Sequence, residues 1–189
     1  MIGMIWAQAH NRAIGENGTV PWHVPEDMAM FRTVTAGSAV VMGRATWESI
    51  EPAYRPLAGR YNYVVTTQDA FTADGATVVH SLEDAITLAE GDDPERMIWV
   101  IGGARVYEQL MDRADGLVVT DLDLEVPEAT AHAPHISFDW QIINAEPERG
   151  WLRSSSGINY RFTEYARKGS RFPVIDLSSA PHSSHDATL

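Results

Sequence analysis

Continuous apolar runs and helix-spaced apolar positions follow one another along the chain. Short apolar runs bounded by turn residues are typical of strands buried on both faces, and they lie at residues 2–9, 38–42, 61–66, 75–79, 97–101 and 117–122. Apolar residues spaced by three and four predict helices at residues 25–35, 45–50, 82–89 and 104–111. This order predicts an α/β fold, a single domain with a mostly parallel central sheet and flanking helices.

Local signals support two of these helices and interrupt the pattern once. Pro25 suits the first position of a helix, and Ser81 with Asp84 three residues later resembles a capping box. Residues 10–24 are predicted to form a loop, because they contain Asn11, Gly15, Asn17, Gly18 and Pro21.

The end of the chain has a different period. Ile158, Tyr160 and Phe162 alternate with polar residues, which predicts a strand with one exposed face. Pairing with residues 140–145 would give the sheet an antiparallel C-terminal edge strand. We expect this domain to span residues 1–167, followed by a flexible tail at 168–189 that holds five serines and two prolines.

Composition narrows the classes of function. The 189 residues include 14 Lys and Arg against 26 Asp and Glu, a formal charge of −12, which argues against nucleic-acid binding but allows a local basic pocket. The absence of cysteine excludes disulfides and cysteine nucleophiles. The histidine pairs His132/His135 and His182/His185 lack a carboxylate at ligand spacing, so we expect no metal site. No signal peptide or membrane span is predicted, and we expect a cytoplasmic protein.

One carboxylate is placed on an apolar helix face. On a helix that begins at Pro25, Asp27 shares a face with Met30, Phe31 and Val34. A carboxylate against an apolar wall resists ionisation and can hold or relay a proton. Taken alone, the simpler explanation is that an acidic residue in the first turn complements the helix dipole.

Two segments join a strand end to a new helix through glycine. Gly43 precedes the helix that contains Arg44, and free amides at a helix start bind phosphate. Gly102 and Gly103 follow the strand at 97–101 and let the backbone approach a ligand closely. The pair is not the Rossmann fingerprint, and an ordinary strand–turn–helix joint explains the first segment equally well.

Taken together, these segments resemble the dihydrofolate reductase family over about residues 1–167. The matching stretches are Ala13-Ile14-Gly15, Val20-Pro21-Trp22, Asp27 and Phe31 at the family's spacing, Gly43-Arg44 with Thr46-Trp47, Ile101-Gly102-Gly103 with Val106-Tyr107, and Pro56-Leu57-Ala58-Gly59-Arg60, where Ala58 replaces a proline. The resemblance implies NADPH-dependent reduction of 7,8-dihydrofolate to 5,6,7,8-tetrahydrofolate for one-carbon metabolism and nucleotide synthesis. Hydride would go to C6 and a proton to N5. Diaminopyrimidine antifolates would be ligands, and the chain would be a monomer.

The resemblance also implies residue roles. Asp27, Trp22 and Tyr107 would be catalytic, and Thr120 would bond Asp27 from the far side. The substrate would contact Ile5, Trp6, Ala7, Asp27, Met28, Phe31, Ile50, Leu57, Arg60, Ile101 and Thr120. The cofactor would contact Ala7, Ile14, Gly15, Val20, Gly43, Arg44, Thr46, Thr66, Thr67, Gln68, His80, Ile101, Gly102, Gly103, Ala104, Arg105, Val106 and Tyr107. The family carries a cis peptide between the paired glycines. Arg60 would pair with the substrate's α-carboxylate, with Arg55 as the less favoured choice.

Two departures from the family pattern concern the cofactor and the mobile loop. Residues 66–68 offer hydroxyls where many relatives have a basic residue, so the preference for NADPH over NADH would depend on Arg44, with His80 as a second candidate. Ala129 stands where many relatives have an acidic residue that steadies the loop from Gly15 to Trp22. Glu128 is one substitute, and the way in which the loop closes stays open.

Three other functions fit part of the pattern. A reductase of a riboflavin-pathway pyrimidine would keep the Gly102-Gly103 segment but would not need Pro21, Trp22 and Asp27. A non-catalytic binding protein on the same scaffold would be indicated by loss of Asp27 or of the glycines, and all are present. An acidic interaction module leaves the pocket pattern unexplained.

Overall fold

The computed structural model describes residues 1–91, 93 and 95–179, and the predicted strands and helices are all present. The strands are β1 (Ile2–Gln8), β2 (Ala13–Gly15), β3 (Ala39–Gly43), β4 (Tyr61–Val65), β5 (Thr77–Val79), β6 (Ile98–Gly102), β7 (Gly116–Leu122), β8 (Ala131–His132), β9 (Trp140–Glu146), β10 (Leu152–Arg153) and β11 (Asn159–Arg167). The α-helices are α1 (Pro25–Thr35), α2 (Arg44–Ser49), α3 (Leu82–Glu90) and α4 (Ala104–Leu110). Short 3-10 turns are η1 (His10–Arg12), η2 (Pro52–Tyr54), η3 (Met111–Arg113) and η4 (Leu177–Ser179).

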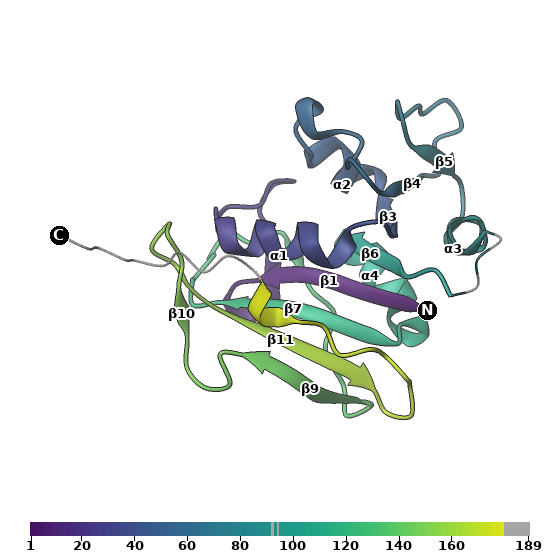
Figure 1. The fold of residues 1–189 in the computed structure, drawn as a ribbon. Coiled ribbons are helices and arrows are strands. Elements are labelled where there is room, and N and C mark those ends of the chain that lie inside the picture. Colours follow the sequence, from purple (N-terminus) through teal and green to yellow (C-terminus); the bar gives the residue numbers. More distant parts are fainter. Residues whose placement is uncertain (92, 94, 180–189) are drawn as a thin grey trace.

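A single large sheet runs through the molecule (Figure 1). Its strand order is β10-β11-β7-β1-β6-β3-β4-β5, and β9 also pairs with β11. The strands from β7 to β5 are mutually parallel, whereas β11 is antiparallel to β7, β9 and β10. The prediction of a mostly parallel sheet with an antiparallel C-terminal part is confirmed.

Both faces of the central strands are buried, which explains their uninterrupted apolar runs. Val40 and Met42 of β3 belong to an apolar cluster that includes Met30 of α1, whereas Val41 belongs to a second cluster with Ile86 of α3 and Leu110 of α4. The alternation of side chains along a strand therefore sends successive residues to two helical layers. Helix α1 packs on the face that carries the candidate site, where Trp47 of α2 belongs to the same apolar cluster.

The first turns of α1 and α3 contain the residues that the sequence predicts for helix starts. Pro25 occupies the first turn of α1, and at α3 the amide of Asp84 donates a 3.0 Å hydrogen bond to the Ser81 hydroxyl. This is the contact of the predicted capping box in which the Ser81 hydroxyl satisfies a free amide of the helix start, and it is confirmed.

Three short strands were not predicted. β2 and β8 form a separate two-stranded sheet, in which Ala13 pairs with His132, and β10 pairs with the start of β11. The pairing of β2 with β8 joins segments more than a hundred residues apart. No local repeat signals such a pairing, because two- or three-residue strands are too short to show one.

The packed part of the chain extends beyond residue 167. Phe172 and Leu177, which fall in the segment predicted as a flexible tail, are only 6% and 2% exposed. The turn η4 contacts α1 and β9. Residues 168–179 are therefore part of the folded body, and residues 180–189 lie outside the described region.

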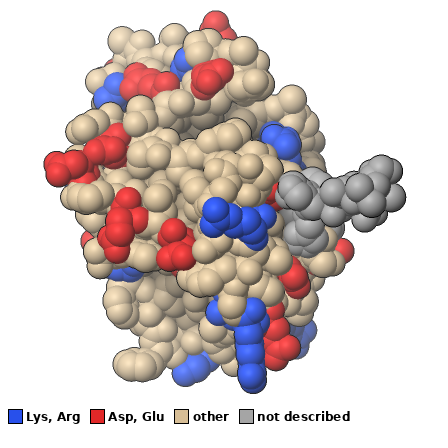
Figure 2. Space-filling view, turned by 90° about the vertical axis from the view of Figure 1, so that its left-hand side faces the viewer, with Lys and Arg blue, Asp and Glu red and all other residues tan. Residues whose placement is uncertain are grey.

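The surface agrees with the composition. On the face drawn in Figure 2, Lys and Arg side chains occur as separate spots among acidic patches, as expected for a formal charge of −12. Within the described part of the chain, no helix is both long and apolar enough to cross a membrane.

Candidate active site

The candidate residues gather where the central parallel strands end. Ala7 lies near the carboxyl end of β1, Gly43 ends β3 and Gly102 ends β6. Helix α1 runs beside these strand ends (Figure 1). Crevices at the carboxyl ends of parallel strands are the usual ligand sites of open α/β sheets, so the fold directs attention to this edge.

Asp27 is joined to the sheet by one short hydrogen bond. The Thr120 hydroxyl donates to Asp27 Oδ1 at 2.6 Å, and Thr120 itself is buried in β7 opposite Ala7 of β1. Burial raises the pKa of the Asp27 carboxyl to about 6, although the bond from Thr120 opposes this change. The carboxyl can therefore gain or lose a proton near neutral pH.

Tyr107 lies beside the same carboxyl. Its hydroxyl donates to the Ile5 carbonyl at 2.7 Å, and its ring centroid lies 5.2 Å from that of Trp6. Burial, followed by the charge of Asp27, raises the pKa of the Tyr107 hydroxyl. The phenol thus stays protonated and holds the edge of α4 against β1.

The paired glycines lie in a narrow space between two strand–helix turns. The peptide between Gly102 and Gly103 is cis, which confirms the expectation from the family. A methyl group on Gly102 would lie 3.2 Å from Thr46 Oγ1 and 3.4 Å from the Tyr107 hydroxyl. A methyl group on Gly43 would lie 3.3 Å from Val106. Side chains at these glycines would therefore fill the cradle between the two turns.

Arg60 is presented by a loop that Asn62 holds in place. The buried Asn62 amide accepts from the Leu57 amide and donates to the carbonyls of Leu57 and Arg60, each at 3.0 Å. The Arg60 guanidinium lies 5.7 Å from the centroid of the Phe31 ring. Its Nε is buried and has no hydrogen-bond partner among the described residues. Burial, and then the charge of Arg32, lowers the pKa of Arg60, so this corner favours an anion.

Apolar residues connect the carboxylate to the arginine. Ile5 belongs to one apolar cluster, and the other members of the predicted wall that pack against it are Ala7, Trp22, Phe31, Ile50, Leu57 and Ile101. Trp6 belongs to the second cluster, against Tyr107. Met28 is 46% exposed on α1. The structure therefore brings most of the predicted substrate residues to one wall, with Trp6 on the opposite face of β1.

The remaining residues predicted to contact the cofactor lie on several different elements. Arg44 donates from Nη1 to both carboxylate oxygens of Glu48 at 3.0 Å, so it is already paired on its own helix. His80 Nδ1 lies 2.9 Å from the Thr66 carbonyl, which places His80 at the 66–68 turn as expected. The other candidates lie on that turn (Thr67, Gln68), on α4 (Ala104, Arg105), on β2 (Ile14, Gly15) and in the loop (Val20).

The loop at 10–24 is tethered at its middle by Thr130. The Thr130 amide donates to the Gly15 carbonyl at 3.0 Å, and the Thr130 hydroxyl accepts from the Asn17 amide at 2.8 Å. These two bonds therefore attach the loop to Thr130, the residue that precedes β8.

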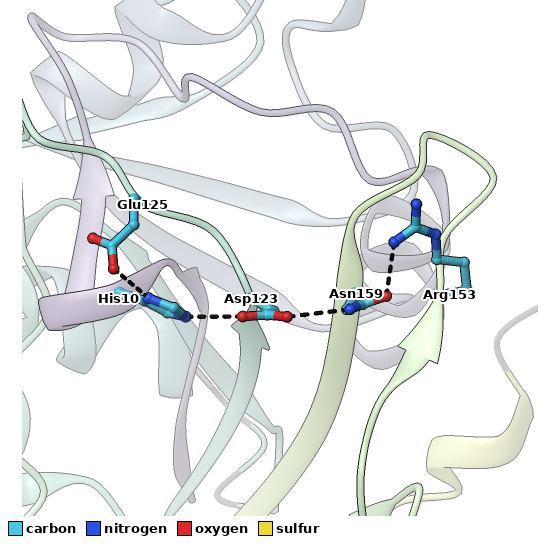
Figure 3. A network of polar contacts seen from close by, with 5 residues as sticks. All are labelled: His10, Asp123, Glu125, Arg153 and Asn159. Carbon is cyan, nitrogen blue, oxygen red and sulfur yellow. Dashed lines mark hydrogen bonds and ion pairs between the residues drawn. The ribbon is translucent and has the colours of Figure 1, made fainter.

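A second tether lies at the base of the loop. His10 contacts Glu125 through Nδ1 at 2.7 Å and Asp123 through Nε2 at 3.2 Å. Asp123 accepts from Asn159, which in turn accepts from Arg153, so the network continues onto β11 and β10 (Figure 3). Hydrogen bonding to Glu125 raises the pKa of His10. The base of the loop is thus attached to the segment after β7 and the middle to Thr130, directly before β8.

Sequence reasoning missed several residues that shape the site. Glu26, next to Asp27, is buried, and its carboxylate accepts from the Ser154 hydroxyl at 2.6 Å and the Ser155 amide at 2.9 Å. Asn62 and Arg32 were also overlooked. A buried Glu26 could have been suspected from its apolar neighbours, but its serine partners are 128 and 129 residues away.

The histidines do not form a metal cluster with other ligand types in the part of the chain that the structure describes. His132 lies on β8 and His135 follows three residues later. His182 and His185 lie outside the described residues.

Comparisons with known proteins agree with this geometry. The dihydrofolate reductase family model matches residues 1–167. Dihydrofolate reductases from Mycobacterium tuberculosis and Bacillus subtilis are 43% and 38% identical to this chain, covering 88% and 90% of it and 98% and 96% of their own lengths. A solved dihydrofolate reductase from Enterococcus faecalis, complexed with NADP(H) and RAB-propyl, has a TM-score of 0.77 at 30% identity, covering 88% of this chain and 96% of its own.

The fold and the site define an α/β oxidoreductase with a carboxylate held beside a diglycine cradle. With these matches over nearly the whole described chain, the class can be narrowed. The chain belongs to the dihydrofolate reductase family.

The loop tether yields a direct prediction. Thr130→Val removes the hydroxyl that accepts from the Asn17 amide while keeping the size of the side chain. Hydrogen exchange of the Asn17 amide should accelerate by about fivefold to tenfold, because one hydrogen bond contributes about 1 kcal/mol. Thr130→Ser keeps the hydroxyl and is the matched control. Equal exchange in the valine and serine variants would show that the hydroxyl does not hold the loop.

Proposed function

We propose that the chain reduces 7,8-dihydrofolate to 5,6,7,8-tetrahydrofolate with NADPH, by hydride transfer to C6 and protonation at N5. Family membership and the neighbour solved with NADP(H) support the reaction class. The observation that carries the proposal is the Asp27 carboxyl, held by Thr120 at an apolar wall with a pKa of about 6. The test is the loss of NADPH absorbance when dihydrofolate is added to the purified protein. A folded protein without that activity would refute the proposal.

Asp27 would bind the polar edge of the pterin ring. A carboxylate has two oxygens, which suits two adjacent donors, here the 2-amino group and N3. Thr120 already occupies Oδ1 from the sheet side, so it fixes the orientation in which the carboxylate faces a ligand. Ile5, Phe31 and the rest of the apolar wall would cover the ring. Diaminopyrimidines present a similar pair of donors, so the same edge would bind antifolates of that class.

The proton for N5 would also depend on Asp27. The group need not touch N5, because it can relay a proton through water. Trp22, in the partly buried wall next to α1, would hold such a water. Tyr107 stays protonated and bonded to Ile5, so its part would be to shape the site at the end of β6. Closure of the 15–22 loop would exclude bulk water.

The residues of the glycine cradle would hold the cofactor. The space that a methyl group on Gly43 or Gly102 would fill supports a close approach of a ligand to the backbone. Thr46, at the start of α2, would bind the pyrophosphate, and Arg44 with the 66–68 turn would bind the adenosine end. NADPH, when bound, supplies the hydride. The tetrahydrofolate formed would supply one-carbon metabolism and nucleotide synthesis.

Arg60 would bind the α-carboxylate of the substrate's glutamate. Its buried Nε without a partner among the described residues and the nearby charge of Arg32 support this role. Arg60→Leu should therefore weaken dihydrofolate binding by about tenfold to a hundredfold, because a hydrogen bond to a charged group contributes about 1.5–3 kcal/mol. NADPH affinity should stay nearly constant. Arg55→Leu, on the same loop, is the matched control for titrations of both ligands.

The outcomes of this titration separate three cases. Equal losses for both ligands would make Arg60 a structural residue. A loss in Arg55→Leu that exceeds the loss in Arg60→Leu would assign the carboxylate to Arg55. No loss in either variant would remove the arginine from the substrate site.

The cofactor preference would depend on Arg44. Arg44→Ala should reduce the ratio of kcat/KM for NADPH to that for NADH, because the 2′-phosphate loses a nearby cation. Glu48→Gln should raise the ratio, since Glu48 now competes for the Arg44 guanidinium. An exposed pair of this kind contributes little to stability, so both variants should fold normally. An unchanged ratio in both variants would point to His80 or backbone amides.

Asp27→Asn should change the pH dependence of hydride transfer as well as its rate. Asparagine keeps the shape but cannot exchange the proton, so the variant would turn over only substrate already protonated in solution. Its single-turnover rate should rise steadily as pH falls and approach the parent rate at acid pH. At neutral pH the deficit should be roughly 10² to 10⁴.

Single-turnover hydride transfer across pH in both proteins, with circular dichroism as a check of folding, makes this measurement. A variant with the parent rate at neutral pH would refute the mechanism. A deficit by one constant factor at every pH would make Asp27 a binding residue only.

A further inference from the structure

The segment that follows the family domain packs onto the sheet face that carries α1. We define residues 170–179 as the C-terminal strap. Figure 1 shows it, in yellow, returning across β11 and β7 toward α1. The family model ends at residue 167, so the strap lies outside the matched domain. Its contacts cannot be inferred from the family pattern.

Phe172 fixes the first half of the strap over the centre of the sheet. Its ring lies edge-on to Trp99 of β6 with centroids 5.9 Å apart. It also covers Gly116 of β7 so closely that a methyl group there would lie 2.2 Å from the ring. The Ser170 hydroxyl donates to the Asp115 carbonyl at 3.0 Å just before this point. Aromatic burial of this kind anchors the chain firmly.

Ile175 is held through its backbone by two side chains of the sheet. Its amide donates to both carboxylate oxygens of Glu164 at 3.1 Å, and its carbonyl accepts from the Asn144 side-chain amide at 2.9 Å. Glu164 is fully buried in β11, and burial raises the pKa of its carboxyl to about 7. A buried carboxyl requires hydrogen-bond partners, and the strap supplies one. The proposed reaction leaves Glu164 without any other role.

Leu177 brings the end of the strap to α1. It is 2% exposed and belongs to the same apolar cluster as Val24 and Met30, which flank Asp27 along the helix. The turn η4, which begins at Leu177, contacts both α1 and β9. Packed side chains behave as a solid and transmit displacement. A change in volume at Leu177 therefore acts on the helix that carries Asp27 and Phe31.

We propose that the C-terminal strap positions α1 for dihydrofolate binding, with Leu177 as a positioning residue that acts through the packing of α1 and touches no ligand. The inference rests on the proposed function, in which Asp27 and Phe31 contact the pterin. It predicts that damage to the strap weakens dihydrofolate binding selectively, because η4 contacts α1 and β9, whereas the cofactor cradle lies on α2, α4 and the ends of β3 and β6.

The test uses the full chain with three substitutions in the strap. Leu177→Ala removes the packing, Leu177→Met keeps the volume, and Val174→Ala changes a residue of the same strap that is 68% exposed. Two quantities are measured for each variant. They are the hydrogen exchange of α1 amides (25–35) without ligand and the Kd values of dihydrofolate and NADPH. Leu177→Val takes the place of Leu177→Ala if the alanine variant does not fold.

We expect Leu177→Ala to accelerate exchange in α1 and to raise the Kd of dihydrofolate by about tenfold, with the Kd of NADPH unchanged. A tenfold loss is what weakening one hydrogen bond between Asp27 and the ligand would cause. Leu177→Met should restore both values, and Val174→Ala should match the parent. Faster exchange with unchanged or equally weakened binding of both ligands would overturn the proposal, as would no change in exchange.

The experiments distinguish a wrong strap proposal from a wrong proposed function. If the proposed site is wrong, Asp27→Asn retains parent binding and hydride transfer, whatever the strap variants do. If only the strap proposal is wrong, Asp27→Asn is defective, whereas Leu177→Ala leaves α1 exchange unchanged or does not weaken dihydrofolate binding selectively.

Discussion

The hydrogen bond from Thr120 to Asp27 joins α1 to β7, the strand beside β1. At 2.6 Å between a hydroxyl and a carboxyl, it is of the short, charge-assisted kind that contributes about 1.5–3 kcal/mol. It fixes Asp27 of α1 against β7, and the same helix carries Phe31, whose ring contacts Arg60. The proton-active carboxyl and the aromatic contact of Arg60 therefore both depend on where α1 lies.

Other contacts of α1 act in the same direction. Glu26 binds Ser154 and the Ser155 amide at the turn before β11, and η4 contacts the helix from the C-terminal strap. α1 has no side-chain cap at its N-terminal residue, Val24. Tertiary contacts thus do the work that a capping side chain would do, as expected for a short helix whose stability comes mainly from packing.

Local patterns predicted the elements of the sheet but not every pairing between them. The 25–35 helix was predicted with its observed limits because Pro25 and the apolar spacing both lie within the element. β2 and β8 were missed because their stability comes from a partner more than a hundred residues away. The composition of residues 168–189, with five serines and two prolines, predicts a flexible tail. Phe172 and Leu177 within it are nevertheless buried by β6, β7 and α1.

For the candidate site, the sequence predicted the residues that stand in motifs but not the residues that hold them in place. Asp27, the glycine pair and Arg60 stand in motifs whose spacing is visible along the chain. The residues that hold them in place were not visible. Asn62 was overlooked because a buried amide in a strand looks like any polar residue until its partners on the 57–60 loop are known. The contacts of Thr130 were not predicted, because its hydrogen bonds to Gly15 and Asn17 join segments more than a hundred residues apart.

The pKa of Asp27 shows why α1 needs so many supports. A carboxyl whose pKa rises from 3.8 to about 6 on folding favours the folded state most below pH 3.8, and this contribution is lost as pH rises through about 6. At neutral pH the ionised group therefore opposes folding relative to acid pH by on the order of 2–3 kcal/mol. The bond from Thr120 reduces this cost but does not remove it. The hydrogen bonds of Glu26 with Ser154 and Ser155, and the buried Leu177, stabilise α1 without relying on the charge of Asp27. The protein can thus keep a carboxyl in an apolar wall, where it is useful for proton transfer, because contacts on other sides of the same helix offset its preference for water.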